Sequence, residues 1–127
     1  MSLELGKLGE SLTQKYLKSK KYKILDTNFR LNYGEIDIVA KYHKIIIFIE
    51  VKSRQFNANV AQNTNPPILP EEEFTITKQK RLLRAINTYL KIHKYPEYVD
   101  WRLDLIAVYF YPDNYEIIHY ENALNIQ

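Results

Sequence analysis

Two carboxylates and a lysine stand near the ends of two apolar segments, where they could bind a divalent metal ion. Asp37 lies in the first segment, and Glu50 and Lys52 end the apolar run that begins at Ile45. In a β-strand, residues two apart point to the same face, so Glu50 and Lys52 are face neighbours. Carboxylates at the end of an apolar strand are costly to desolvate, and a divalent cation with water ligands is a natural compensation.

The sequence offers a metal oxygen ligands only. It contains no cysteine, and its three histidines, His43, His93 and His119, lack the spacing of metal ligands. A disulfide framework and a Cys-based zinc site are therefore excluded. Oxygen ligands favour Mg²⁺ or Mn²⁺ as the cofactor, and we expect no small-molecule organic cofactor.

The chemistry predicted from these residues is hydrolysis of a phosphodiester. A metal held by Asp37 and Glu50 would polarise a phosphoryl oxygen and activate a bound water, and Lys52 would orient that water or offset charge in the transition state. The alternative is structural, with Asp37 and Glu50 as strand-end residues that pair with Lys52 or Arg54.

The surrounding residues predict a domain of mixed α and β structure. Apolar residues at helical spacing predict helices over residues 3–20 and, after an N-cap candidate in Thr75-Ile76-Thr77, over a segment that ends near His93. Runs of β-formers predict strands over residues 22–30, 35–40, 45–52, 101–110 and 115–120, with 45–52 as a buried central strand. The order α-β-β-β-α-β-β predicts an α/β (α+β) fold, a mixed β-sheet flanked by helices, in one domain over residues 1–127.

Whether Asp37 joins Glu50 depends on the turn between their strands. Glu35, Asp37 and Val39 share one face of the earlier strand. A two- or four-residue hairpin loop brings that face together with the face of Glu50 and Lys52, whereas a three- or five-residue loop without a bulge separates them. The sequence leaves both registers open.

Residues 53–74 change in character, to Asn, Gln, Pro and Glu. A connection of this length without a periodic pattern is uncommon in a compact domain and is usually functional or disordered. We predict a mobile loop over 53–74 beside the site.

The net charge and the hydropathy of the sequence indicate which binding partners and which cellular location to expect. The formal net charge of +3 and the pI of about 9.0 are compatible with a polyanionic partner. No stretch approaches the ~20 apolar residues of a membrane-spanning helix, and the start lacks a signal-peptide pattern. We expect a cytoplasmic protein with no membrane partner.

Basic residues of the second helix are candidates for nucleic-acid contacts. Lys80, Arg84, Lys91 and Lys94 follow one side of it, as a phosphate-tracking face or as an ordinary solvated face. Lys78 and Arg81 lie near the helix start, where the dipole and the free amides also favour anions.

Glu10 and Glu35 have two interpretations each. Glu10 is seven residues from both Leu3 and Leu17, at nearly the same helical angle, with Gly6 one turn before it. It is either an inward-facing residue of the site or an ordinary surface glutamate. Glu35 is either an outer metal ligand or a polar residue at a strand end.

A wider resemblance includes these positions. Gly34-Glu35-Ile36-Asp37, the apolar strand and Glu50-Val51-Lys52-Ser53-Arg54 resemble the PD-(D/E)XK phosphodiesterase superfamily, which implies the restriction-endonuclease-like fold. The chain is more closely similar to the small bacterial YraN-like family, itself similar to archaeal Holliday-junction resolvases. The resemblance covers most of the chain and extends to Gly6, Gly9-Glu10, Tyr16-Leu17, Asn28-Phe29-Arg30, Lys78, Arg81-Leu82, Tyr89-Leu90 and Arg102-Leu103-Asp104.

The resemblance implies roles for individual residues. Asp37 and Glu50 correspond to metal carboxylates, Val51 to a backbone carbonyl ligand, Lys52 to the catalytic lysine, and Glu10 to a helix glutamate that completes the site.

Two features of the sequence depart from the pattern of the family. The Pro of the superfamily's name is absent before Asp37, and the segment 53–74 is long for this family, which leaves its role open.

The function implied is that of a metal-dependent endonuclease. Its expected partner is nucleic acid, DNA above all, with branched or Holliday-junction DNA as a candidate substrate and a homodimer as the implied assembly. Two alternatives stay open: a nucleic-acid-binding module with a nuclease-like fold that lacks catalysis, and a nuclease-like subunit that needs a partner.

Overall fold

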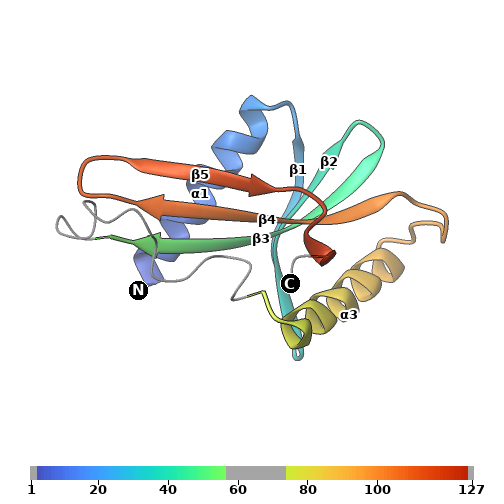
Figure 1. The fold of residues 1–127 in the computed structure, drawn as a ribbon. Coiled ribbons are helices and arrows are strands. Elements are labelled where there is room, and N and C mark those ends of the chain that lie inside the picture. Colours follow the sequence, from blue (N-terminus) through green and yellow to red (C-terminus); the bar gives the residue numbers. More distant parts are fainter. Residues whose placement is uncertain (1–2, 57–73, 126–127) are drawn as a thin grey trace.

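The computed structural model describes residues 3–56 and 74–125 as a five-stranded sheet with one long helix on each face (Figure 1). In chain order the elements are α1 (Leu3–Ser19), β1 (Lys23–Leu31), β2 (Gly34–Tyr42), β3 (Ile45–Gln55), α3 (Ile76–Ile92), β4 (Trp101–Phe110), β5 (Tyr115–Tyr120) and the short 3-10 helix η2 (Ala123–Asn125). The predicted order α-β-β-β-α-β-β is confirmed, and η2 is an addition to it.

The sheet is mixed, as predicted. Its strand order is β1-β2-β3-β4-β5, with β3 and β4 parallel and the other neighbours antiparallel. A parallel pair needs a long crossover connection, and α3 lies in that connection between β3 and β4. The central position of β3 agrees with its run of β-branched residues, because both faces of a central strand are covered.

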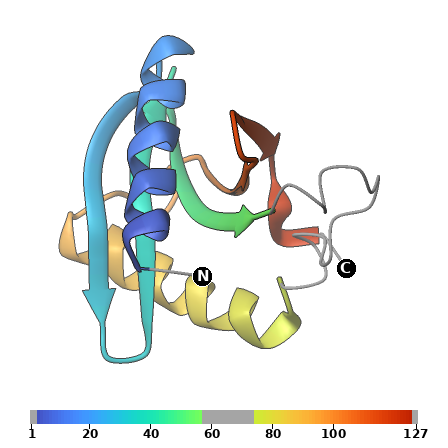
Figure 2. The same ribbon diagram turned by 90° about the vertical axis from the view of Figure 1, so that its left-hand side faces the viewer.

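Period-two alternation along β3 divides the core into two layers. Ile46 and Phe48 pack in the cluster beneath α3, and Ile47 and Ile49 pack in the cluster beneath α1. The division follows from the period of two along a strand, which puts alternate residues of 45–52 on opposite faces. Figure 2 shows the two helices on opposite sides of the sheet, with α1 in front of β1 and β2 and α3 below.

The spacing of Leu5, Leu8, Leu12, Tyr16 and Leu17 predicts one buried face for α1, and the structure differs from this prediction in part. The buried residues of α1 are Gly9, Thr13 and Leu17, whereas Leu8 is 47% exposed. Small side chains allow a helix to approach a sheet closely, and Gly9 does so at β3. A Cβ placed at Gly9 would collide with Ser53 Oγ and lie 3.3 Å from Ser53 Cβ. The Leu-based pattern could not reveal this, because the contact depends on a glycine.

Gly9→Ala should therefore destabilise the protein by about 1–3 kcal/mol, because the new methyl group overlaps the buried Ser53 hydroxyl. Urea unfolding measures the loss. The double variant Gly9→Ala/Ser53→Ala should recover most of it, and Ser11→Ala on the exposed side of α1 should stay within about 0.5 kcal/mol of the parent. Equal losses in the single and double variants would contradict the close-approach explanation.

The start of α3 agrees with the predicted cap. Thr75 has an extended backbone, and its side chain accepts a hydrogen bond from the Lys78 N–H. A side-chain oxygen at the N-cap satisfies one of the free N–H groups of the first turn. The predicted apolar stripe is also found, with Leu82, Ile86 and Tyr89 buried, so the helix faces the sheet as expected.

The predicted loop over 53–74 is wrong at its start. β3 continues to Gln55 because its parallel pairing with β4 continues to Gln55↔Phe110. Phe56 is buried and its N–H donates to the Phe110 carbonyl. Polar residues here misled the sequence interpretation, since a partner strand extends β3 beyond its apolar run. Residues 57–73, the rest of the predicted loop up to Phe74, lie outside the described residues.

In the described part of the chain, no helix is both long enough and apolar enough to cross a membrane.

Candidate functional site

The β2–β3 hairpin has the register that brings the predicted carboxylates together. Its last pair is Tyr42↔Ile45, so the turn contains two residues, His43 and Lys44, and His43 has a positive φ of 56°. A two-residue turn aligns odd positions of β2 with even positions of β3. Asp37 therefore faces Glu50.

The two strands separate just where these carboxylates stand. β2 and β3 are paired from Tyr42↔Ile45 to Ile38↔Ile49, and Asp37 and Glu50 come next on each strand. Figure 2 shows the end of β3 bending away from β2. The Val51 N–H donates to Asp37 Oδ2 at 2.8 Å, so a side chain satisfies a backbone donor of β3 beyond the paired region. This separation opens the sheet next to the carboxylates.

The Asp37 and Glu50 carboxyl groups contact each other in a buried position. Burial raises the pKa of Asp37 to about 9, and the hydrogen bond with Glu50 and the Glu50 charge act in the same direction, whereas the Val51 N–H opposes them. Two carboxyl groups that share a hydrogen bond resist being ionised together. Without a cation, the pair therefore retains a proton at neutral pH.

Lys52 lies beside this pair. Its Nζ is 3.6 Å from Glu50 Oε2, and the side chains of Lys52 and Glu50 are 24% and 16% exposed. The predicted face-neighbour relation is confirmed. The Lys52 ammonium group offsets the charge of the Asp37–Glu50 pair, which carries about one negative charge while it retains a proton.

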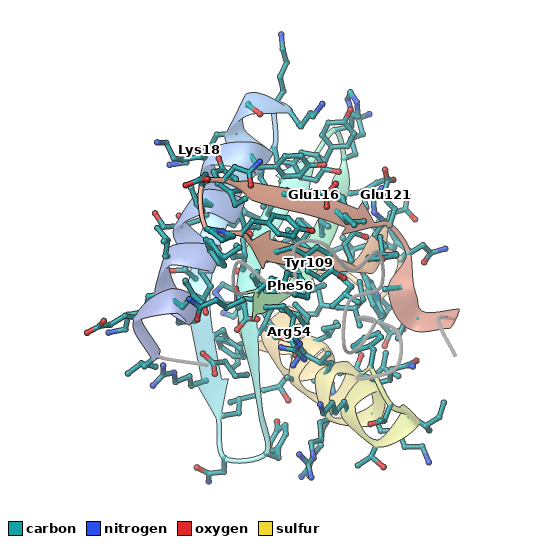
Figure 3. The ribbon with its side chains drawn as sticks, turned by 60° about the vertical axis from the view of Figure 1, so that its left-hand side comes forward. Lys18, Arg54, Phe56, Tyr109, Glu116 and Glu121 are labelled. Atoms are coloured by element: carbon teal, nitrogen blue, oxygen red, sulfur yellow. The ribbon has the colours of Figure 1, made fainter. Side chains whose placement is uncertain are left out.

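A cavity of about 520 Å³ opens over these residues. We call the carboxylates that line it the acidic half, which consists of Glu10, Glu35, Asp37 and Glu50 from α1, β2 and β3. We call the cations that line it the basic half, which consists of Lys52, Arg54, Lys78 and Arg81 from β3 and α3. Figure 3 shows Arg54 near the end of β3, close to α3.

Glu10 faces the cavity and is half-buried, which settles its two predicted orientations in favour of the inward one. Burial raises the pKa of Glu10, as do the charges of Asp37 and Glu35, and Arg30 and Asn28 oppose this shift. Glu35 also lines the cavity, with its Oε1 3.2 Å from Arg30 Nε. Both glutamates thus add negative charge to the acidic half.

The predicted basic residues of α3 divide into two groups. Lys78 and Arg81 line the cavity, and the charge of Lys52, followed by burial, lowers the pKa of Lys78. Lys80 is exposed outside the cavity lining, and the Arg84 guanidinium lies over the Tyr33 ring at 3.9 Å from its centroid. Helical phase separates the pairs, so Lys78 and Arg81 are the ones next to the carboxylates.

The carboxylates at the centre of the site fit a hard divalent cation, and the residues farther from the centre offer weaker ligation. Within residues 3–56 and 74–125, no group of three His, Cys, Asp or Glu side chains is close enough to hold a metal ion. Asp37 and Glu50 supply two carboxylates, and Val51 lines the same cavity. The buried, mutually repelling pair is the observation that favours a cation, because Mg²⁺ accepts a few carboxylate ligands and keeps several waters.

Asn28 and Ser53 are features of the site to which the sequence interpretation assigned no role. Asn28 has a positive φ of 53° and contacts Glu10 and Glu35, while Ser53 Oγ is buried and has no hydrogen-bond partner among residues 3–56 and 74–125. Asparagine is depleted in strands and tolerates the left-handed backbone, which is a weak signal for Asn28. The contacts of both residues follow from the way α1 packs on the sheet.

The comparisons with known proteins give a family. Residues 9–108 match the group described as Uncharacterised protein family UPF0102. A UPF0102 protein of Clostridium beijerinckii is 34% identical over 125 residues, which covers 97% of this chain and 94% of that protein. One of Alkaliphilus oremlandii is 38% identical over 125 residues, covering 97% and 99%. Among solved structures, a chain titled "Crystal structure of SSO0001" aligns with a TM-score of 0.35 and 18% identity, over 93% of this chain and 50% of that one. Because the family match spans most of the sequence, the chain belongs to the UPF0102 family.

Proposed function

We propose that this protein is a metal-dependent endonuclease that hydrolyses DNA phosphodiester bonds, with Mg²⁺ or Mn²⁺ as its cofactor. The observation that carries the proposal is the buried contact between Asp37 and Glu50 beside Lys52. The resemblance to the PD-(D/E)XK superfamily and to junction resolvases supports it, and makes branched DNA the first substrate to try.

Each residue of the centre has a task in this reaction. Asp37 and Glu50, with the Val51 carbonyl, would hold the cation, which when bound supplies Lewis-acid stabilisation and activates water. Lys52 orients the attacking water and offsets charge that develops on the phosphoryl group. The Val51 N–H fixes Asp37 through the 2.8 Å hydrogen bond, so this carboxylate is oriented before substrate arrives.

The basic half provides a place for the phosphates of the substrate. Arg54, Lys78 and Arg81 line the same cavity as the carboxylates. A polyanion enters an acidic site only if nearby cations offset the repulsion, and Lys and Arg side chains at the rim do so. The backbone phosphates next to the scissile bond would contact the basic half while the scissile phosphate lies over the acidic half.

The test is cleavage by the purified protein. Linear duplex, single-stranded and four-way-junction DNA are incubated with Mg²⁺, Mn²⁺ or EDTA. We expect cutting that requires the metal and falls by about 10²-fold or more in Lys52→Ala. Lys44→Ala, an exposed lysine in the β2–β3 turn, is the matched control and should cut like the parent.

Two results would contradict the proposal. Cutting that persists in EDTA or in Lys52→Ala would place the activity elsewhere or in a contaminant. DNA binding without cutting under any of these conditions would favour the nucleic-acid-binding module instead.

A further inference from the structure

Asn28 occupies an unusual backbone position next to the proposed metal site. It lies in β1 with a positive φ of 53°. The pairs on either side of it are Thr27↔Ile38 and Phe29↔Ile36, so Asn28 stands across from Asp37 on β2. Asparagine and glycine adopt this left-handed conformation more readily than other residues. The residue type therefore suits the backbone, and the register places it at the site.

The Asn28 side chain connects two carboxylates from different elements. With its amide nitrogen turned toward them, it donates to Glu10 Oε1 at 3.1 Å and to Glu35 Oε1 at 3.2 Å. An asparagine amide has two N–H donors, and each is used once here. These bonds join α1 to the β1–β2 hairpin at the edge of the cavity.

A neutral donor is well suited to this place. Glu10 and Glu35 line one cavity with the Asp37–Glu50 pair, and these negative charges repel one another. Arg30 already pairs with Glu35 at 3.2 Å through an exposed side chain. The Asn28 amide adds a hydrogen bond to each of Glu10 and Glu35 without adding further positive charge.

We propose that Asn28 is a positioning residue of the metal site. Its side-chain amide donates to both Glu10 and Glu35, and this holds the Glu10 carboxylate toward the Asp37–Glu50 pair. The inference rests on the proposed function, and deepens it. A glutamate side chain on a helix has several rotamers, and fixing one of them costs entropy that a hydrogen bond offsets. Without the amide, Glu10 gains freedom to turn to solvent, and the outer part of the cation site is lost.

The test uses a variant that spares the backbone. Asn28→Gly removes the amide, and glycine keeps the positive φ at little steric cost. Asn122→Gly is the matched control, because Asn122 is also exposed, has a φ of 56°, and contributes only its backbone N–H to a hydrogen bond with Asp104. Thermal unfolding checks that both variants are folded.

The first measurement is Mn²⁺ binding by calorimetry, without DNA. We expect about 10-fold weaker binding in Asn28→Gly, the size of effect typical of residues that orient metal ligands, and parent affinity in Asn122→Gly. Because Asn28 acts through Glu10, the double variant Glu10→Ala/Asn28→Gly should bind Mn²⁺ no more weakly than Glu10→Ala.

The second measurement needs no metal. In a ¹⁵N–¹H spectrum, the side-chain amide signals of Asn28 should shift in Glu10→Ala, because one N–H loses its acceptor.

Each outcome has a separate meaning. Parent-like Mn²⁺ affinity in Asn28→Gly, additive losses in the double variant, or Asn28 amide signals that do not respond to Glu10→Ala would each overturn the positioning role. If the parent binds Mn²⁺ and Asp37→Asn does not, the proposed metal site stands whatever Asn28 does. If the parent binds no Mn²⁺, the proposed function and this inference both fail.

Discussion

Asp37→Asn is expected to abolish cleavage while making the metal-free protein more stable. Asp37 is buried against Glu50 and its pKa is raised to about 9, so its ionised form is unfavourable in the folded state. Asparagine is nearly the same size, still accepts a hydrogen bond from the Val51 N–H, and donates to Glu50. Loss of the carboxylate should lower the cleavage rate by about 10³-fold or more.

The gain in stability should depend on pH. The unfolded chain releases the Asp37 proton near 3.8, and the folded protein holds it up to about 9. The folded state thus binds more protons between these values, and the contribution of Asp37 to stability falls as pH rises through this window. At pH 8 we expect Asp37→Asn to be more stable than the parent by about 1–3 kcal/mol, with a smaller difference at pH 5.

Urea unfolding in EDTA at pH 5, 7 and 8 measures this difference. Asp113→Asn, in the exposed turn before β5, is the matched control and should change stability by less than about 0.5 kcal/mol. Added Mg²⁺ should stabilise the parent and leave Asp37→Asn unchanged, because a ligand stabilises the form that binds it. A variant less stable than the parent at pH 8 would show that the Asp37 carboxylate contributes to the fold rather than to a site.

Asp104→Ala is expected to have the largest effect on stability, a loss of about 3–5 kcal/mol at pH 7. The Asp104 carboxylate is fully buried. It accepts hydrogen bonds from Arg102 at 2.9 and 3.1 Å, from His119 Nε2 at 2.7 Å and from the Asn122 N–H at 3.0 Å. Removing it leaves the largely buried Arg102 and His119 donors without this acceptor, which costs more than the net value of the bonds themselves.

The network around Asp104 connects the sheet to the end of α1. Arg102 donates to the Tyr22 hydroxyl at 2.9 Å, and the Tyr16 hydroxyl lies 3.0 Å from His119 Nδ1. Arg102 and Asp104 form an ion pair at 2.9 Å, with side chains 18% and 0% exposed. Loss of Asp104 should therefore loosen the packing of α1 as well as β5.

This prediction also depends on pH, in the opposite sense to Asp37. Burial acts to raise the pKa of Asp104, but the bonds from His119, Arg102 and the Asn122 N–H outweigh it, so the pKa of Asp104 lies below 3.8. A lowered folded-state pKa gives stability that is present above the unfolded value and is lost as pH falls through the folded value. The penalty of Asp104→Ala should be complete at pH 7 and should shrink below about pH 4.

Urea unfolding at pH 7 and pH 3 tests this expectation. Asp100→Ala, an exposed aspartate just before β4, is the matched control. Glu121→Gln removes the 64% exposed carboxylate that also pairs with Arg102, and exposed pairs contribute about 0–1 kcal/mol. A loss in Asp104→Ala as small as that of Glu121→Gln would contradict a buried, stabilising role.

Much of the fold follows from local patterns. The β-branched run from Ile45 predicts the central strand, the Thr75 cap predicts the start of α3, and 101–110 and 115–120 match β4 and β5 to the residue. These predictions succeed because side-chain periodicity and capping are local properties. The extension of β3 to Gln55 was missed, because it depends on pairing with β4, which lies far along the chain.

The features of the site also divide into those that follow from local sequence patterns and those that depend on tertiary structure. That Glu50 and Lys52 share a face was determined by the sequence alone, since the period of a strand is two. That Asp37 joins them was decided by the hairpin register, a choice between turn lengths that the sequence left open. The inward position of Glu10, the place of Arg81 at the cavity, and the Asn28 bridge were decided by tertiary packing. Each needs α1 or α3 placed against the sheet to within a few ångströms. Periodicity tells which residues share a face of one element, but only the packing of several elements brings their side chains into contact.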